Sequence, residues 1–193
     1  MPAESAAGAK RRLRACERHS PRKEPPGTAT SAHQRLLALP ELAGVGTVSL
    51  YLGQGREVPT AELFRELARR GLRLALPRVQ GSELSLREVR DLSELSGEHR
   101  GIRQPGADSP AISPEEVDLF VVPGVCFDRS GARLGRGGGH FDRLLARAGP
   151  RALRVGLCYA SQIVEQVPTE AWDERVDILV AESGVIRVER GAP

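Results

Sequence analysis

A run of glycines around an arginine is the part of this sequence whose residue types point most directly to chemistry. Four of the five residues from Gly135 to Gly139 are glycine, and the fifth is Arg136. Glycine loses more conformational entropy on folding than other residues, so such a run suits a backbone that approaches a ligand closely. Backbone N–H groups ahead of a helix bind phosphate oxygens, and an arginine holds phosphate with paired hydrogen bonds. The run therefore predicts a phosphate-binding loop; the alternative is a flexible surface loop.

The run differs from both common nucleotide-binding motifs. Walker A needs Lys followed by Ser or Thr after its last glycine, and G-x-G-x-x-G needs a glycine where this chain has His140. Asp142 falls in the first turn of the helix expected after the loop. A carboxylate at that place either caps the helix or holds Mg²⁺.

The elements that must position this loop alternate between strand and helix. An almost continuous apolar run at Val117–Val122, ended by Pro123-Gly124, is typical of a central parallel strand. The other strands are expected at Val45–Leu52, Leu72–Leu76, Leu84–Val89 (an edge strand), Arg154–Cys158, Ile178–Val180 and Val185–Val188. Helices are expected at 10–18, His33–Leu39, Thr60 (N-cap) to Gly71, His140–Ala148 and Ser161–Gln166. Residues 91–116 are turn-rich and are expected to form a long connection. The alternation predicts an α/β three-layer sandwich with a mainly parallel central sheet and helices on both faces.

Composition indicates one ordinary globular domain. The chain has 193 residues, 40% of them hydrophobic and 27% charged, which is enough apolar material for one core. Residues 1–9 are expected to be a disordered tail and residues 10–193 a single domain, with a divergent helical segment at 10–40. The net charge of +3 is concentrated at the start, because residues 1–23 hold seven Lys or Arg and two Glu. The remainder holds 21 basic and 23 acidic residues, which disfavours nucleic acid as a partner.

Several further function classes receive no support from the sequence. The three cysteines form no C-x-x-C pair and are odd in number, so neither a zinc site nor a disulfide framework follows. No apolar run approaches the length of a membrane span, and the start lacks the apolar core of a signal peptide. We expect a cytoplasmic monomer with no membrane partner. For the only tryptophan, Trp172, a core position and a pocket wall fit equally well.

The segment from Pro123 to Arg143 reads P-G-V-x-F-D-x-x-G-x-R-L-G-R-G-G-G-x-x-D-R and resembles the signature of the 5-formyltetrahydrofolate cyclo-ligase family, also called methenyltetrahydrofolate synthetases. Further stretches resemble the same family in the same order: the K-x-x-L-R run at Lys10–Arg14, and the segments Tyr51–Thr60, Gly101–Pro105, Gly156–Pro168 and Asp173–Asp177. Two features depart from the family pattern. The segment between Arg14 and Leu39 is shorter and richer in proline, and His140 stands where members usually have Tyr.

The resemblance implies conversion of 5-formyltetrahydrofolate to 5,10-methenyltetrahydrofolate, with ATP going to ADP and phosphate and Mg²⁺ as cofactor. The implied ATP-binding residues are Lys10, Arg11, Arg12, Leu13, Arg14, Arg133, Leu134, Gly135, Arg136, Gly137, Gly138, Gly139, His140 and Phe141. The implied folate-binding residues are Leu52, Glu57, Arg136, Gly137, Gly138, Gly139 and His140, with Arg136 also catalytic. The implied Mg²⁺ ligands are Asp142 and Asp173.

This reaction suits the residues present, since phosphoryl transfer depends mainly on positioning and charge neutralisation. No protein nucleophile is required, in agreement with the lack of a convincing Ser/His/Asp or Cys/His set. Two alternatives stay open. One is a non-catalytic folate- or nucleotide-binding relative that keeps the loop. The other is a nucleic-acid accessory protein that binds through its basic head.

Overall fold

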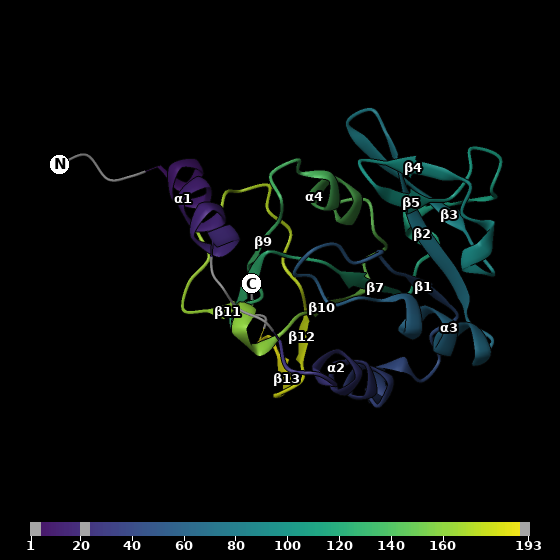
Figure 1. The fold of residues 1–193 in the computed structure, drawn as a ribbon, viewed down its shortest axis with the longest axis horizontal. Coiled ribbons are helices and arrows are strands. Elements are labelled where there is room, and N and C mark those ends of the chain that lie inside the picture. Colours follow the sequence, from purple (N-terminus) through teal and green to yellow (C-terminus); the bar gives the residue numbers. More distant parts are fainter. Residues whose placement is uncertain (1–4, 20–23, 190–193) are drawn as a thin grey trace.

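The computed structural model describes residues 5–19 and 24–189 and contains the predicted layered α/β architecture (Figure 1). The central sheet has eight strands in the order β13-β12-β10-β7-β1-β2-β3-β6. The five strands from β12 to β2 pair in parallel, and β13, β3 and β6 are antiparallel additions at the two edges. Their bounds are β1 Thr47–Ser49, β2 Arg73–Gln80, β3 Glu83–Glu88, β6 Ala111–Ile112, β7 Leu119–Val122, β10 Leu153–Leu157, β12 Ile178–Ala181 and β13 Gly184–Arg187.

Helices cover both faces of the sheet, which confirms the predicted sandwich. Helices α2 (Thr28–Leu37) and α3 (Ala61–Arg69) lie on one face. Helix α4 (His140–Leu145) lies on the other, beside a small sheet of order β11-β8-β9. That sheet consists of Cys126–Asp128 (β8), Arg133–Leu134 (β9) and Ile163–Val164 (β11).

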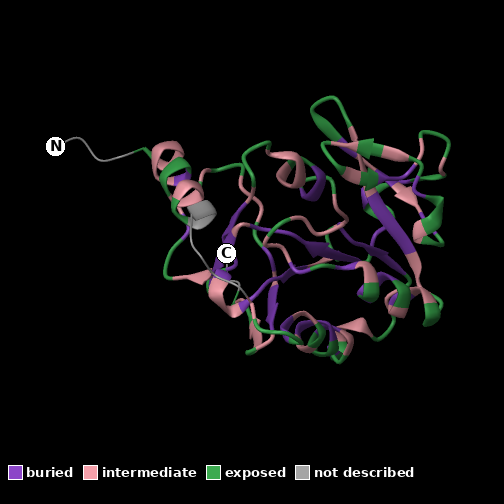
Figure 2. Ribbon diagram, viewed as in Figure 1, coloured by how far each residue is buried: buried purple, intermediate pink, exposed green. Residues whose placement is uncertain are grey.

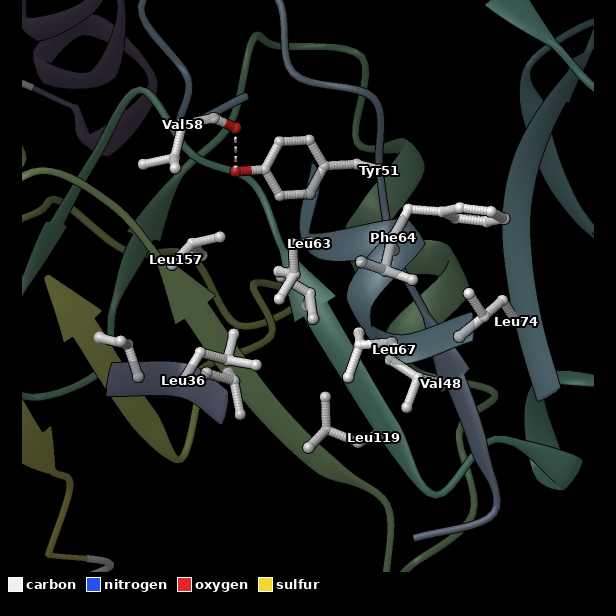
Figure 3. Close-up of a cluster of buried hydrophobic side chains, with 14 of the residues drawn as sticks. Leu36, Val48, Tyr51, Val58, Leu63, Phe64, Leu67, Leu74, Leu119 and Leu157 are labelled. Carbon is white, nitrogen blue, oxygen red and sulfur yellow. Dashed lines mark hydrogen bonds between the residues drawn. The ribbon is translucent and has the colours of Figure 1, made fainter. Parts of the chain in front are cut away.

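Strand β7 contributes side chains to the cores on both faces of the sheet, because successive side chains of a strand point in opposite directions. Leu119 and Val121 belong to the core under α2 and α3, whereas Phe120 and Val122 belong to the core under α4. All four are buried, as are most residues of the central strands (Figure 2). Figure 3 shows the first core, in which aliphatic side chains from several elements pack together and the Tyr51 hydroxyl donates to the Val58 carbonyl over 3.1 Å.

The N-terminal helices are longer than the sequence predicted. Helix α1 spans Ala6–His19, so residues 6–9 belong to a helix and not to the expected tail; residues 1–4 lie outside the described part. Ser5 explains the earlier start, because its Oγ accepts a hydrogen bond from Gly8 N at 3.3 Å. Helix α2 likewise begins at Thr28 directly after Gly27, instead of at His33.

Other predicted boundaries are corrected by pairing that the sequence does not reveal. Strand β2 continues through Pro77 to Gln80. Proline has no backbone N–H to donate, but β1 pairs with β2 only as far as Ala75, so no hydrogen bond to β1 is lost at Pro77. Strand β3 is not the edge strand, because β6 pairs outside it. The helix expected at Ser161–Gln166 is one 3₁₀ turn followed by β11. Helix α4 ends at Leu145, three residues earlier than expected.

The segment predicted to be a long connection, residues 91–116, contains a hairpin of its own. Strands β4 (Gly97–His99) and β5 (Ile102–Gln104) pair around a tight turn. The Gln104 side chain accepts a hydrogen bond from Val79 N at 3.0 Å, and Arg78 Nη1 donates to Pro105 O at 2.6 Å. These contacts fix the hairpin against the end of β2. Within the described residues, no helix is long and apolar enough to cross a membrane.

The turn between β8 and β9 is a point where only glycine fits. The Asp128 carboxylate accepts hydrogen bonds from the backbone N–H groups of Ser130 at 2.9 Å, Ala132 at 3.2 Å and Val167 at 2.8 Å. Gly131 in this turn has φ +79, and a Cβ there would lie 2.3 Å from the Val176 carbonyl oxygen. The F-D-x-x-G part of the sequence signature is therefore structural.

We predict that Gly131→Ala lowers the free energy of unfolding by about 3 kcal/mol, because strain from the left-handed backbone adds to a clash with main-chain atoms. Gly81→Ala is the matched control, since Gly81 has φ +60 but open space around its Cβ position. It should cost about 1 kcal/mol. Urea unfolding of the two variants measures the difference. Equal losses would show that the Val176 contact is easily relieved.

Candidate active site

A cavity of about 490 Å³ opens at the carboxyl ends of the parallel strands, the place where ligands bind in such sheets. Its wall includes Tyr51, Leu52 and Glu57, which follow β1, and Pro123-Gly124, which follow β7. The glycine-rich loop, helix α1 and the β4–β5 hairpin complete the wall. Helix α1 and the hairpin stand well apart in Figure 1, so the cavity joins distant parts of the molecule.

The backbone of the glycine-rich loop is held by arginines from outside it. Arg14 Nε donates to the Gly135 carbonyl at 2.8 Å, and Arg143 Nη2 donates to the Gly138 carbonyl at 2.9 Å. Gly137 has φ +107 and Gly139 has φ +63, a conformation that other residues adopt only with strain. The glycines are thus needed for the backbone path, and the arginines compensate for the flexibility that they bring.

Helix α1 is attached to the site by a buried lysine. Lys10 Nζ lies 2.7 Å from Glu170 Oε2 and 2.5 Å from Asp173 Oδ2. Burial alone lowers the pKa of Lys10, but hydrogen bonds to the carboxylates of Asp173 and Glu170 outweigh it and raise that pKa above its ordinary value. The cation therefore stays charged and connects the first helix to the segment around residue 170.

A second ion pair joins β9, directly before the loop, to α4. The Arg133 side chain is only 3% exposed, and its Nη2 lies 2.6 Å from Asp142 Oδ1. Its guanidinium carbon lies 5.9 Å from the centre of the Phe141 ring, within range of a cation–π contact. The Nε atom of Arg133 is buried and has no protein partner. A buried guanidinium with a spare donor on a cavity wall suits an anionic ligand.

Arg136 bridges the loop and the segment after β1. Its Nε donates to Glu57 Oε1 at 2.9 Å, while Nη1 and Nη2 donate to the side chain and backbone oxygens of Gln54 at 2.8 and 2.7 Å. Gln54 N in turn donates to the second carboxylate oxygen of Glu57 at 2.9 Å. Two residues predicted for the site, Arg136 and Glu57, are therefore in direct contact.

His140 lies in a cationic part of the cavity. Burial, together with the charges of Arg143, His99 and Arg100, lowers the pKa of His140 below its ordinary value. The ring is therefore neutral at pH 7 and offers one donor and one acceptor, as a hydroxyl group does.

Most of the predicted site residues lie on the cavity wall. Those that line it are Lys10, Arg11, Arg14, Leu52, Glu57, Arg133 to Phe141, Asp142 and Asp173. Two members of the predicted ATP set do not. Leu13 packs against the small apolar cluster of Cys126, Ala132, Leu134 and Val167, and Arg12 is exposed and absent from the wall. Helical periodicity explains the difference, because only residues three or four apart, such as Lys10 and Arg14, share a face.

The two predicted metal ligands already have protein partners. Asp142 pairs with Arg133, and Asp173 pairs with Lys10 and accepts a hydrogen bond from Glu170 N at 2.6 Å. Within residues 5–19 and 24–189, no group of three or more His, Cys, Asp or Glu side chains is arranged to hold a metal ion. The protein alone therefore presents scattered carboxylates and no closed metal cage.

Sequence reasoning missed several wall residues. The hairpin contributes His99, Arg100 and Arg103, and the segment after β1 contributes Gln54. Glu170 went unnoticed although it lies three residues from Asp173, and Trp172 takes a place in the wall and not in the core. A positive charge at 99–103 was the only available signal for the hairpin, and it was weak without the pairing that positions it.

Cations, carboxylates and a glycine-rich loop around one cavity at the ends of parallel strands define an α/β enzyme that acts on anionic small molecules. The chain belongs to the 5-formyltetrahydrofolate cyclo-ligase family, whose family model matches residues 3–182. It is 31% identical over 159 residues to the 5-formyltetrahydrofolate cyclo-ligase of Escherichia coli (strain K12), across 80% of this chain and 87% of the relative. It is 34% identical over 157 residues to that of Haemophilus influenzae, across 78% and 83% of the two chains.

A solved structure at 34% identity agrees with this assignment, and a second one agrees with the fold. The structure of Aquifex aeolicus 5,10-methenyltetrahydrofolate synthetase superimposes on this chain with a TM-score of 0.81 at 34% identity. The match covers 97% of this chain and 95% of the Aquifex chain. The 5,10-methenyltetrahydrofolate synthetase from Mycoplasma pneumoniae shares the fold, with a TM-score of 0.69 at 21% identity over 93% of this chain and 99% of its own.

We predict that Lys10→Met lowers the free energy of unfolding by about 2 kcal/mol, because it leaves Glu170 and Asp173 without their shared cation. Arg11→Met is the control, as the neighbouring Arg11 is exposed. Limited proteolysis should cut α1 faster in the Lys10 variant only. Equal cleavage of both variants would show that the ion pairs do not hold the helix in place.

Proposed function

We propose that this chain is a 5-formyltetrahydrofolate cyclo-ligase, which uses ATP to convert 5-formyltetrahydrofolate to 5,10-methenyltetrahydrofolate and releases ADP and phosphate. The observation that carries the proposal is the docking of α1 onto the glycine-rich loop through Arg14 and Gly135 at the cavity wall. This contact unites two stretches of the family signature that lie 121 residues apart in the chain. It gives the cavity a cationic end suited to nucleotide phosphates.

The nucleotide fits the end of the cavity formed by α1. Lys10, Arg11 and Arg14 line it, and the buried Arg133 adds a guanidinium with an unpaired Nε. Arginine holds phosphate oxygens through its fork of donors, and loop glycines permit close approach of the backbone. The loop would thus hold the terminal phosphates.

The folate fits the rest of the cavity. Leu76, Val79, Leu84 and Ile102 give this end an apolar floor for the flat rings, with Leu52 beside them. The Glu57 carboxylate is only 12% exposed and can accept hydrogen bonds from a pterin. The hairpin adds three basic side chains to the cavity wall that would attract an anionic glutamate tail: His99, Arg100 and Arg103.

The reaction follows from bringing the two substrates together. The N5-formyl group is an amide, so its carbon is a poor electrophile. Transfer of the γ-phosphoryl group from ATP to the formyl oxygen turns that oxygen into part of a leaving group. N10 then attacks the carbon and loses its proton, and the C–O bond breaks to release phosphate and leave the methenyl bridge. Because N10 belongs to the same molecule, ring closure needs orientation more than a strong base.

Arg136 is the residue best placed to act on the transferred group. It lies on the glycine-rich loop and contacts Glu57, so it connects the nucleotide end with the folate end. Gln54 and Glu57 occupy three of its five N–H donors. Two donors are left, one on each terminal nitrogen, for charge that develops on the phosphoryl oxygens.

Mg²⁺ fits the chemistry of the wall as an ion that arrives with the nucleotide. It is commonly bound by one or two carboxylates together with phosphate oxygens and water, and Asp142 and Asp173 supply carboxylates at the cavity. When bound, the ion neutralises phosphate charge. Lys10 and Arg133 neutralise the same carboxylates in the protein alone.

Purified protein supplied with 5-formyltetrahydrofolate, ATP and Mg²⁺ should gain the absorbance of the methenyl product, and omission of ATP should abolish the gain. Arg136→Ala should lower kcat/KM about 100-fold, the usual effect of removing one donor to a transition-state oxygen. Arg65→Ala, an exposed arginine of α3 on the opposite face of the sheet, should act as wild type. If saturating substrates give no product in the wild type, the chain is instead a non-catalytic relative. Near-normal turnover of Arg136→Ala would refute the role of that residue.

Chelation of divalent cations with EDTA should stop turnover and leave the thermal unfolding midpoint unchanged. The reason is that Lys10 and Arg133 already neutralise the candidate ligands, so the fold does not depend on the ion. Restoring Mg²⁺ should restore product formation. A lower unfolding midpoint after chelation would indicate a structural metal, contrary to this assignment.

A further inference from the structure

Trp172 is the one large apolar side chain that stands exposed among the described residues, with 67% of its surface accessible, and it lines the cavity. A tryptophan left in water forgoes the burial of a large apolar surface. The indole also lies at a cavity edge next to charged groups and not alone on a convex surface. The exposed indole therefore suits a flat ligand whose two faces are apolar.

The turn that carries Trp172 is held rigidly. Asp173 N donates to Glu170 O at 3.0 Å, Glu170 N donates to Asp173 Oδ2 at 2.6 Å, and Lys10 bonds to both carboxylates. The residues on either side of the indole are thus fixed to each other and to α1. The backbone that carries the indole is therefore in place before a ligand arrives, which reduces the entropy lost on binding.

We propose that Trp172 is the stacking surface for the purine base of the nucleotide; this rests on the function proposed above. The end of the cavity at which Trp172 lies indicates that its partner is the nucleotide base and not the folate. Trp172 shares a turn with the partners of Lys10, so it lies at the cationic α1 end that suits phosphates. The apolar floor of Leu76, Leu84 and Ile102, which suits the folate, comes from β2, β3 and the hairpin. Indole faces stack on any base but stack more strongly on the larger purines.

The chain offers a direct test because Trp172 is its only tryptophan. Its fluorescence should fall when ADP with Mg²⁺ is titrated into the wild-type protein. It should stay unchanged with inorganic tripolyphosphate and Mg²⁺, which supply the phosphates without a base. Equal quenching by both ligands, or none by ADP at concentrations shown by calorimetry to bind, would overturn the proposal.

Kinetics give a second, independent readout. Trp172→Leu should raise the KM for ATP about ten-fold, as expected for the loss of one base–aromatic stack. Its kcat and its KM for 5-formyltetrahydrofolate should stay within two-fold of wild type. Trp172→Phe should recover most of the ATP affinity, and the preference for ATP over CTP should shrink in the Leu variant only. Circular dichroism melting checks that both variants are folded.

An increase in the KM for folate in place of that for ATP would assign Trp172 to the other substrate and refute the proposal. Failure of the cyclo-ligase activity itself is distinguishable from failure of the stack. A wild-type protein without turnover would still report base stacking through the comparison of ADP with tripolyphosphate.

Discussion

The site depends on hydrogen bonds from arginine side chains to the carbonyl groups of the glycine-rich loop. A loop of glycines has almost no side chains of its own to fix its path, and each glycine adds freedom to the unfolded chain. Arg14 and Arg143 bond to the carbonyls of Gly135 and Gly138, and Arg136 extends from the loop to Gln54. Because peptides are planar and trans, the N–H that follows each captured carbonyl points to the opposite side. Side chains from α1 and α4 thus decide which way the loop amides face.

The fold could be predicted wherever the burial of an element requires a recognisable pattern of apolar residues in the sequence. The apolar run that ends in β7 had no polar alternation, as a strand covered on both faces requires, and its residues divide between the two cores. The β4–β5 hairpin left no such pattern, because its strands have three residues each and are half exposed. Its stability comes from contacts such as Gln104 with Val79 N, which only the folded chain brings together.

Many residues of the cavity wall could be predicted from the sequence, but the contacts that connect them could not. Loop glycines and nearby arginines are visible as residue types, and the resemblance to a family added Glu57 and Asp173. The pairing of Lys10 with Asp173 joins residues 163 positions apart, and that of Arg136 with Gln54 spans 82 positions. Nothing in local propensity or periodicity encodes such distant electrostatic pairs. Helical periodicity separates Arg12 and Leu13 from the face of Lys10 and Arg14, but only docking decides which of these faces meets the loop.

Each carboxylate on the cavity wall is paired with a cation, and this restricts what can bind. Carboxylates on its wall pair with cations on the same wall: Asp173 with Lys10, Asp142 with Arg133 and Glu57 with Arg136. A bare polyphosphate would draw the cations to itself and leave carboxylates half buried without partners, which is costly. A cation alone would do the reverse to Lys10 and Arg133. A nucleotide accompanied by Mg²⁺ brings both signs, so each wall charge can exchange one partner for another. Under the proposed function, this arrangement would favour the metal–nucleotide complex over either component by itself.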